Sequence, residues 1–165
     1  PNVQNLTFSE TADVFTMIYP EAETINPILA EKIRAQGDLQ YRKTNVQADM
    51  TKWTMFKDPD FEKIINFAID VVKAGLDLPN LGKYVVTDCW GALYKKGDSC
   101  FTYYVDATPE DSPLVFPTSG NAIYLNSGLM VVFPGWVTHS VPEQKNDRER
   151  IVIAGNLTIE RPQAE

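Results

Sequence analysis

The pattern of apolar residues changes near residue 83, and this change constrains the fold more than any other feature of the sequence. Before it, apolar residues recur at helical spacing. After it, short apolar runs alternate with turn residues. Many short strands at such spacing favour a sandwich or a jelly roll. We therefore expect a mainly β fold with helices on one side, a cupin-like jelly roll or double-stranded β-helix. A single domain over 1–165 would have its helical part at 1–82 and its β core at 83–159.

Start and stop signals give the expected elements. Asn26-Pro27 reads as an N-cap followed by proline at the first helical position, and Gly37 as a stop, which predicts a helix over 26–36. Asp58-Pro59 repeats the start signal, and apolar spacing up to Gly75 predicts a helix over 59–74. The expected strands are 11–19, 84–94, 101–105, 114–116, 122–125, 129–133, 137–141 and 150–159.

Charge and composition exclude several classes of partner. The chain carries 22 acidic and 15 basic residues, a net charge of -7, which argues against broad capture of nucleic acid or of anionic membranes. No apolar run approaches the roughly 18 residues of a membrane span, and the N-terminus lacks the layout of a secretory signal. Two cysteines are too few for a disulfide framework, so we expect reduced thiols in a cytoplasmic protein, with Cys89 buried and Cys100 exposed.

The chain has a single histidine, His139, in the segment FPGWVTHSVPE. Val137, His139 and Val141 would share one face of the strand expected after the turn at Pro134-Gly135. An imidazole on the inner face of a jelly roll can ligate a metal, and the alternative is a histidine satisfied by a neighbour. A mechanism that needs two or three histidines of this chain is excluded by the sequence as it stands.

Arg150 begins the apolar run Ile151–Ala154. A charged residue that faces the interior must be paired, and a guanidinium suits a planar carboxylate, which it grips with two hydrogen bonds. The alternative is an exposed arginine at the start of a strand. Arg148 lies in a polar loop, where we expect solvent exposure.

Three tyrosines are candidates for contact with a ligand. Tyr103 and Tyr104 fall on opposite faces of one strand, so one of them faces the interior. An inward phenol could donate to a carboxylate or simply pack in the core, and Tyr124 carries the same alternatives. For Trp136 a packed aromatic ring is the expected role.

The stretch FPGWVTHSVPEQKNDRERIVIAGN resembles the C-terminal half of the Fe(II)/2-oxoglutarate-dependent oxygenases, and more narrowly those common in phages and marine bacteria. The matching positions are Gly128-Leu129, Phe133-Pro134-Gly135-Trp136, His139, Val141-Pro142, Glu149-Arg150-Ile151 and Asn156. Weaker matches upstream are Thr44-Asn45-Val46, Met50-Thr51, Trp53, Trp90, Lys96-Gly97-Asp98, 101–105 and 113–117. The similarity covers residues 40–158.

The resemblance implies a cofactor, a cosubstrate and the residues that bind them. Two histidines and a carboxylate, or a close variant, would hold Fe(II), with His139 as one ligand. Arg150 would bind the distal carboxylate of 2-oxoglutarate, and we assign Tyr103 and Tyr124 to the same cosubstrate site. The iron would supply the chemistry that hydroxylates an unactivated C–H bond.

The sequence departs from the family at the first metal ligands. The family places H-x-D or H-x-H just before the strand that corresponds to 101–105, whereas here Gly97–Cys100 runs into Phe101 without a histidine. We expect that a loop with these ligands is missing at the Cys100–Phe101 junction. Val152 stands where the family often has a serine. The substitutes available as ligands are Asp88, Asp98, Cys100 and Asp106.

Three functions follow as expectations. The first is an Fe(II)/2-oxoglutarate-dependent dioxygenase, a hydroxylase acting on a protein residue or a metabolite in the cytoplasm (of the host, if the protein is viral). The second is a non-catalytic jelly-roll binding module that has lost the metal site. The third is a cupin-like binder of a sugar or a small acid. A complete metal site would separate the first from the second, and a homodimer is compatible with each.

Overall fold

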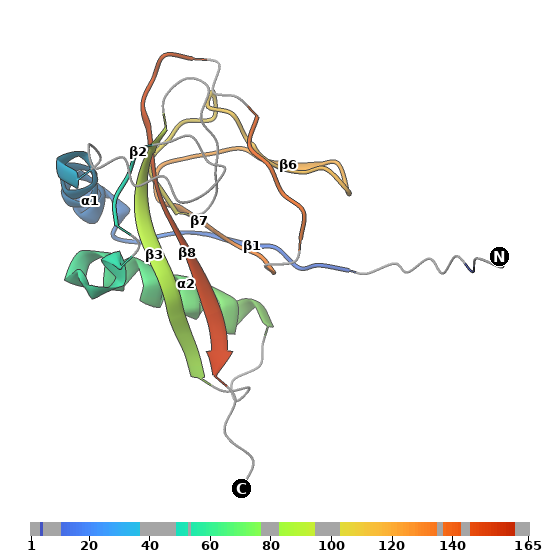
Figure 1. Ribbon diagram of the computed structural model, residues 1–165. Coiled ribbons are helices and arrows are strands. Elements are labelled where there is room, and N and C mark those ends of the chain that lie inside the picture. Colours follow the sequence, from blue (N-terminus) through green and yellow to red (C-terminus); the bar gives the residue numbers. More distant parts are fainter. Residues whose placement is uncertain are drawn as a thin grey trace, which may run out of the picture.

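The computed structural model describes residues 4, 11–36, 49–52, 54–76, 83–94, 103–134, 137–142 and 146–160. The elements, in chain order, are β1 (Phe15–Ile18), α1 (Ala22–Gln36), β2 (Asp49–Met50), the short 3-10 helix η2 (Met55–Lys57), α2 (Pro59–Leu76), β3 (Lys83–Tyr94), β4 (Tyr103–Asp106), β5 (Leu114–Phe116), β6 (Asn121–Ile123), β7 (Leu129–Val132) and β8 (Arg150–Glu160) (Figure 1). Neither described α-helix is both long and apolar enough to cross a membrane.

The described strands are joined in antiparallel ladders. One sheet has four strands in the order β2-β3-β8-β4, and two further pairs are β1-β7 and β5-β6. The pairing of β3 with β8 runs from Lys83 opposite Glu160 to Tyr94 opposite Arg150, with one irregularity between Val86 and Asp88. β8 therefore lies inside the sheet, hydrogen-bonded to β3 along one edge and to β4 along the other.

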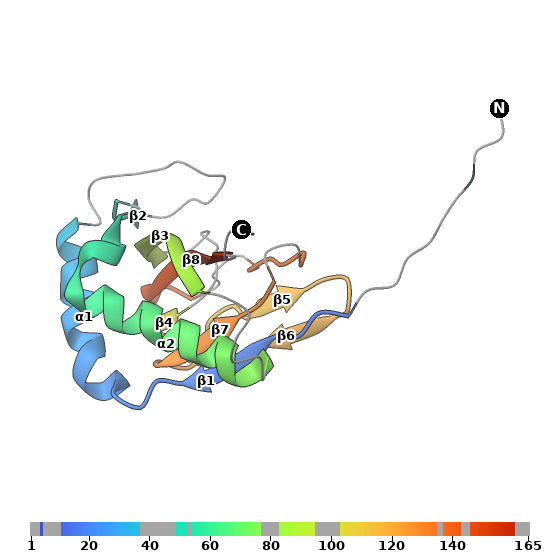
Figure 2. The ribbon, with the colours of Figure 1, turned by 90° about the horizontal axis from the view of Figure 1, so that it is seen from below.

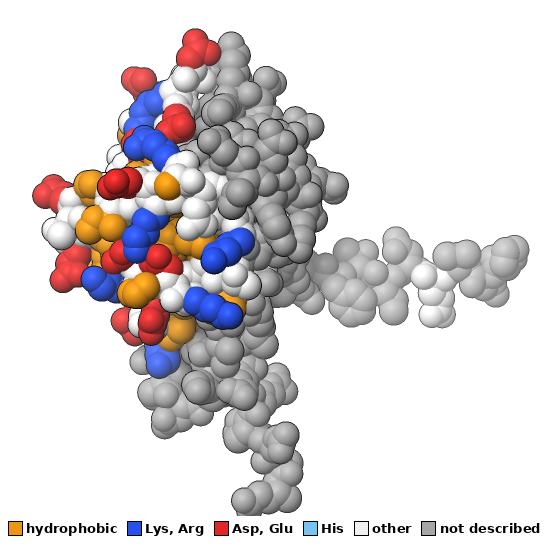
Figure 3. Space-filling view, turned by 60° about the vertical axis from the view of Figure 1, so that its left-hand side comes forward, with side chains coloured by type: hydrophobic (Ala, Val, Ile, Leu, Met, Phe, Trp, Pro, Cys, Tyr) orange, Lys and Arg blue, Asp and Glu red, His pale blue; other side chains and the backbone are white. Residues whose placement is uncertain are grey.

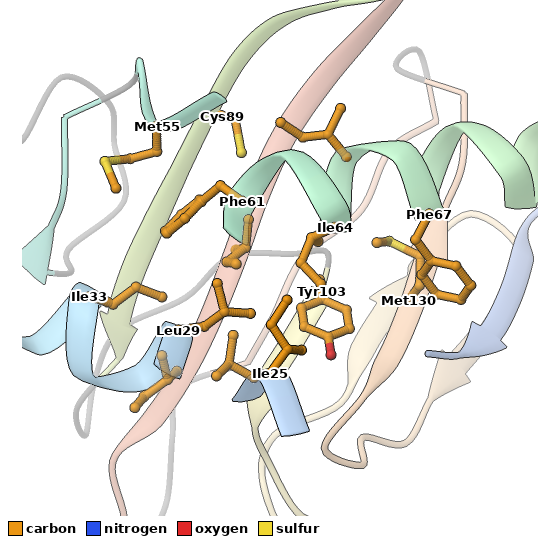
Figure 4. Close-up of a cluster of buried hydrophobic side chains, with 14 of the residues drawn as sticks. Ile25, Leu29, Ile33, Met55, Phe61, Ile64, Phe67, Cys89, Tyr103 and Met130 are labelled. Atoms are coloured by element: carbon orange, nitrogen blue, oxygen red, sulfur yellow. The ribbon is translucent and has the colours of Figure 1, made fainter. Parts of the chain in front are cut away.

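Both α-helices cover one face of the four-stranded sheet (Figure 2). Leu29 and Ile33 of α1, and Phe61 and Ile64 of α2, are nearly or fully buried in the layer between the helices and the strands. Figure 4 shows these side chains together with Tyr103 of β4. We call this layer the helix-side core.

A second core lies on the opposite face of β8, and we call it the inner core. Its buried members are Tyr104, Ala107, Leu114, Phe116, Leu125, Leu129, Val131, Val141, Val152 and Ala154. Successive residues of a strand point to opposite faces, so β8 contributes Ile151 and Ile153 to the helix-side core and Val152 to the inner core. Burial on both faces explains the unbroken apolar run in this strand.

Helix α1 begins at Ala22, four residues before the expected start at Asn26, and Pro27 lies inside it. Ala22 and Ile25 are buried, so packing extends the helix upstream of the proline. The φ angle of proline suits a helix, and Pro27, the sixth residue of α1, forgoes one backbone hydrogen bond because it lacks an N–H. Asn26 lies inside the helix and is not its N-cap, and its Oδ1 accepts a hydrogen bond from the hydroxyl of Tyr103 at 2.6 Å. The helix does end before Gly37, as expected.

Helix α2 begins at Pro59, as predicted, with Asp58 as its cap. The backbone N–H of Asp60 donates to Oδ1 of Asp58 at 2.8 Å, and Lys32 of α1 donates to both Asp58 and Asp60. Burial acts to raise the pKa of Asp58, but the hydrogen bonds from Lys32 and from the backbone outweigh it and hold that pKa below its usual value. Figure 3 shows a face of the molecule on which acidic and basic side chains intermingle.

Other elements also differ from the sequence expectations. The strand expected over 11–19 is β1, four residues long. Helix α2 continues past Gly75, where a Cβ would stand 2.5 Å from the ring of Phe15, so this glycine permits the close approach of β1. The strand expected over 137–141 is a single bridge between Ser140 and Val115.

Candidate functional site

His139 lies beside the inner core, in the segment after β7. The ring Nδ1 lies 2.8 Å from the backbone carbonyl of Val137. A carbonyl only accepts, so this bond places the proton of the neutral ring on Nδ1 and leaves Nε2 as the nitrogen with a lone pair. The ring also packs edge-on against Phe133, with 4.7 Å between the two centroids. This is how ligand histidines are usually oriented, through a hydrogen bond from the nitrogen that does not bind the metal.

Arg150 is the first residue of β8 and is completely buried. Its position along the strand matches Val152 and Ala154, so it faces the inner core. Nη1 donates to the backbone carbonyl of Ser112 at 3.1 Å. The expectation of an inward-facing guanidinium is thus met by the geometry, and the alternative of an exposed arginine is wrong.

The structure brings His139 and Arg150 to the same side of the sheet. Phe133 and Val137, which contact the imidazole, pack against the inner core. Val152 and Ala154, which share the face of Arg150 on β8, belong to the same core. The inner core thus has an oriented imidazole at its border and a buried guanidinium on the face of β8 that lines it. The first can donate a lone pair and the second can hold an anion.

The two tyrosines assigned to the cosubstrate site lie elsewhere. Tyr103 faces the helix-side core, opposite Ile153, and its hydroxyl is used by Asn26. Burial raises its pKa, with Asn26 lowering it in part. Tyr124 directly follows β6 and is 65% exposed. Neither phenol faces the inner core, so the geometry supports neither assignment. The tyrosine on that face is Tyr104, which pairs with Val152 and is completely buried.

Arg148 was expected in solvent, but its half-exposed side chain belongs to an ionic network that includes the buried Asp111. Its guanidinium pairs with Asp106 and, at 3.0 Å, with Oδ2 of Asp111. The side chain of Asn146 donates to Oδ1 of Asp111 at 2.9 Å. Asp106, a possible metal ligand in the sequence, is therefore engaged by an arginine. Sequence reasoning missed the network because its members come from three separate segments. The one available signal was the acidic Glu110-Asp111 turn ahead of a strand.

The described residues do not complete a metal site. Among them, no three His, Cys, Asp or Glu side chains lie close enough together to hold a metal ion. The side chain of Asp88 lies outside the described residues, as do Asp98, Cys100, Trp136 and the Cys100–Phe101 junction. Cys89 is buried, as predicted, and burial raises the pKa of its thiol to about 12. Cys89 belongs to the helix-side core, whereas His139 borders the inner core, so Cys89 does not add to the donor set around His139.

The fold is shared with solved structures of prolyl hydroxylases. The viral collagen prolyl hydroxylase of Paramecium Bursaria Chlorella virus-1, solved as a 2OG complex, is 14% identical with a TM-score of 0.65, over 87% of this chain and 95% of that one. A prolyl-4-hydroxylase of Pseudomonas putida is 20% identical with a TM-score of 0.59, over 93% of each chain.

A third structural neighbour is HygX from Streptomyces hygroscopicus, solved with nickel and 2-oxoglutarate bound. It is 10% identical with a TM-score of 0.58, over 88% of this chain and 81% of that one. No protein-family model matches the chain, and no curated protein matches it. At these identities the likeness establishes a common fold, sheet-rich with few helices.

Proposed function

We propose that this chain is a 2-oxoglutarate-dependent oxygenase that hydroxylates an unidentified substrate, and that its sheets form the two halves of a double-stranded β-helix. The observation that carries the proposal is Arg150, a completely buried guanidinium on the inner face of this fold. Two of the structural neighbours were solved with 2-oxoglutarate bound, which supports a carboxylate as the partner of that guanidinium.

Arg150 would bind the distal carboxylate of 2-oxoglutarate. A guanidinium is always charged at physiological pH, and its planar fork matches the two oxygens of a carboxylate. In the apolar surroundings of the inner core this pairing is stronger than it would be in water. The buried strand position holds the fork in place, so that little side-chain freedom is lost on binding.

His139 would supply one ligand to Fe(II), through Nε2. The hydrogen bond from Nδ1 to the carbonyl of Val137 sets the tautomer and fixes the plane of the ring. Iron, when bound, supplies the oxidation chemistry. Among the described residues we assign one metal ligand, His139, and the proposal names no other.

Titration calorimetry with 2-oxoglutarate tests the role of Arg150. Parent protein should bind it, and Arg150→Ala should bind more weakly by about 2–5 kcal/mol, the usual loss for one partner of a buried charge pair. Arg150→Met fills the same space without charge and should lose affinity equally. Arg34→Gln is the matched control. It also removes an arginine, but the ion pair of Arg34 is exposed and is made with Glu149, the residue just before Arg150. Equal affinity in the parent and in both Arg150 variants would show that Arg150 does not bind the distal carboxylate of 2-oxoglutarate.

Turnover tests the oxygenase itself. Parent protein with Fe(II), oxygen, ascorbate and 2-oxoglutarate should release succinate even without its own substrate, and His139→Ala should release none. Succinate formation that is the same in His139→Ala would contradict a role for that imidazole.

One observation favours the second function, a non-catalytic binding module on the same fold. The described residues hold a single candidate ligand, and Asp106 is engaged by Arg148. Such a module would bind 2-oxoglutarate through Arg150 with the same affinity with and without metal, and it would release no succinate.

A further inference from the structure

Asp111 is a buried carboxylate that holds two segments of the chain together. It is 2% exposed. Its Oδ2 accepts hydrogen bonds from the backbone N–H of Thr108 at 2.8 Å and from Nη1 of Arg148 at 3.0 Å. Its Oδ1 accepts from the side-chain amide of Asn146 at 2.9 Å. A buried carboxylate is tolerated only with such compensation, so these contacts form a rigid joint between 108–112 and 146–148.

The joint fixes the acceptor of Arg150 from one side. Ser112 follows Asp111 directly, and its carbonyl accepts the hydrogen bond from Nη1 of Arg150. The turn before it is closed, because the N–H of Asp111 donates to the carbonyl of Thr108 at 3.0 Å. The carbonyl that orients the guanidinium therefore belongs to a segment that Asp111 holds in place.

The same joint fixes Arg150 from the other side. Arg148 stands just ahead of the strand that carries Arg150, and its backbone N–H donates to Oδ1 of Asn146 at 3.1 Å. The second ion pair of Arg148, with Asp106, ties this segment to β4. The strand that carries the guanidinium and the carbonyl that receives its hydrogen bond are thus held by contacts that meet at Asp111.

We propose that Asp111 is a positioning residue for Arg150, which sets where the guanidinium stands and hence how strongly the site selects a dicarboxylate. The proposal rests on the proposed function, which names the ligand. A guanidinium forms two hydrogen bonds to a carboxylate only when both groups are held in one relative orientation. A small displacement of the guanidinium therefore weakens the binding of the carboxylate. Loosening the joint therefore weakens the grip on the distal carboxylate and leaves the rest of the ligand unaffected.

The test compares two probes that differ only at the distal end. 2-Oxopentanoate has the chain length of 2-oxoglutarate, with a methyl group in place of the distal carboxylate. Asp111→Asn keeps the size of the side chain and removes its charge. Arg148→Gln removes the partner from the half-exposed end of the joint. Arg34→Gln deletes an arginine whose ion pair, with Glu149, lies outside the joint, and it serves as the control.

The readout is the ratio of the two dissociation constants. Parent protein should prefer 2-oxoglutarate, and this preference should fall by about tenfold in Asp111→Asn and in Arg148→Gln but not in Arg34→Gln. Lower stability alone reduces the folded fraction for both probes and leaves the ratio unchanged. If the parent prefers 2-oxoglutarate and Asp111→Asn prefers it equally, Asp111 does not position Arg150, and the proposed function still stands.

A second measurement needs no ligand. In protein labelled with 15N-arginine, the Nε–H signal of Arg150 is assigned by its loss in Arg150→Lys. It should shift or broaden in Asp111→Asn and stay unchanged in Arg34→Gln. If the parent does not distinguish the two probes, the proposed function fails, and this signal decides the positioning role alone: an unmoved signal in Asp111→Asn refutes it.

Discussion

Tyr103 and Tyr104 show how far alternation along a strand can be read from sequence. The pattern established that one phenol faces inward, but not which one. Residues 103–105 are all buried, since the sheet has a core on each face. A run that is apolar on both faces carries no mark of which side is which. The answer came from the register, which sets Tyr104 beside Val152 and Tyr103 beside Ile153.

Arg150 was easier to place than its partners. A charged residue at the head of an apolar strand has few options, and carboxylate recognition follows from its chemistry. The carbonyl of Ser112 and the network at Asp111 could not be foreseen, because backbone acceptors and contacts between distant segments leave no trace in a single sequence.

The Tyr103→Phe substitution should destabilise the protein without affecting the cosubstrate. It removes the hydrogen bond to Asn26, so the free energy of unfolding should fall by about 0.5–1.5 kcal/mol in urea. Affinity for 2-oxoglutarate should match the parent, because the phenol lies on the helix side of the sheet. A large loss of affinity with unchanged stability would return Tyr103 to the cosubstrate site.

At the scale of elements, helix boundaries show where local signals compete with packing. At Asp58-Pro59 the cap and the proline coincide with the start of burial, and the predicted start of α2 is confirmed. The similar pair Asn26-Pro27 lies inside α1, because burial already begins upstream of it, at Ala22 and Ile25. A start signal is decisive only where the apolar stripe begins with it.

Two glycines with positive φ offer a matched pair of substitutions. Gly128 has φ +87°, and a Cβ there would stand 2.7 Å from the Cβ of Ala22. Gly120 has φ +74° with nothing within 4 Å of that position. Both alanine variants acquire left-handed strain, but only Gly128→Ala also overpacks the start of α1.

We therefore expect Gly128→Ala to lower the free energy of unfolding by about 1–3 kcal/mol more than Gly120→Ala does. Urea unfolding of the two variants measures the difference. Equal losses would mean that Ala22 moves aside freely and that the contact between α1 and the turn before β7 is loose.

For the whole molecule, the change of pattern at residue 83 correctly separated helices from most of the strands. The first part also holds the strand expected over 11–19, which is β1 and pairs with β7. The sequence pattern missed β2, which pairs with β3, because a strand of two residues is too short for periodicity to reveal. A complete set of metal ligands could not be predicted, since only one histidine exists and other oxygen or sulfur donors follow no fixed spacing.

Stability should fall in alkali because the helix-side core contains a protonated thiol. Burial raises the pKa of Cys89 to about 12, against about 8.5 in an unfolded chain. Below pH 8.5 both states keep the proton, and the stability is fully present. Between about 8.5 and 12 only the unfolded state releases it, so the free energy of unfolding falls by up to about 1.4 kcal/mol per pH unit.

Urea unfolding at pH 8, 9 and 10 measures this slope. The Cys89→Ala variant is the control, and its stability should depend less on pH over the same range. The buried phenol of Tyr103 adds a loss of the same sign at higher pH, because its pKa is also raised. An identical slope in Cys89→Ala would show that the thiol is not the titrating group.

The position of β8 between two cores has a consequence for how this protein can evolve. From Arg150 to Ala154 every side chain is buried on one face or the other, so this stretch has no neutral position at which variation can accumulate. A new specificity that arose by changing it would disturb the fold at the same step. The exposed turn between β5 and β6, at 117–120, carries no such penalty. Adaptation to new substrates, in nature or in a mutant library, should therefore be carried by the turns, while the strand stays as inherited.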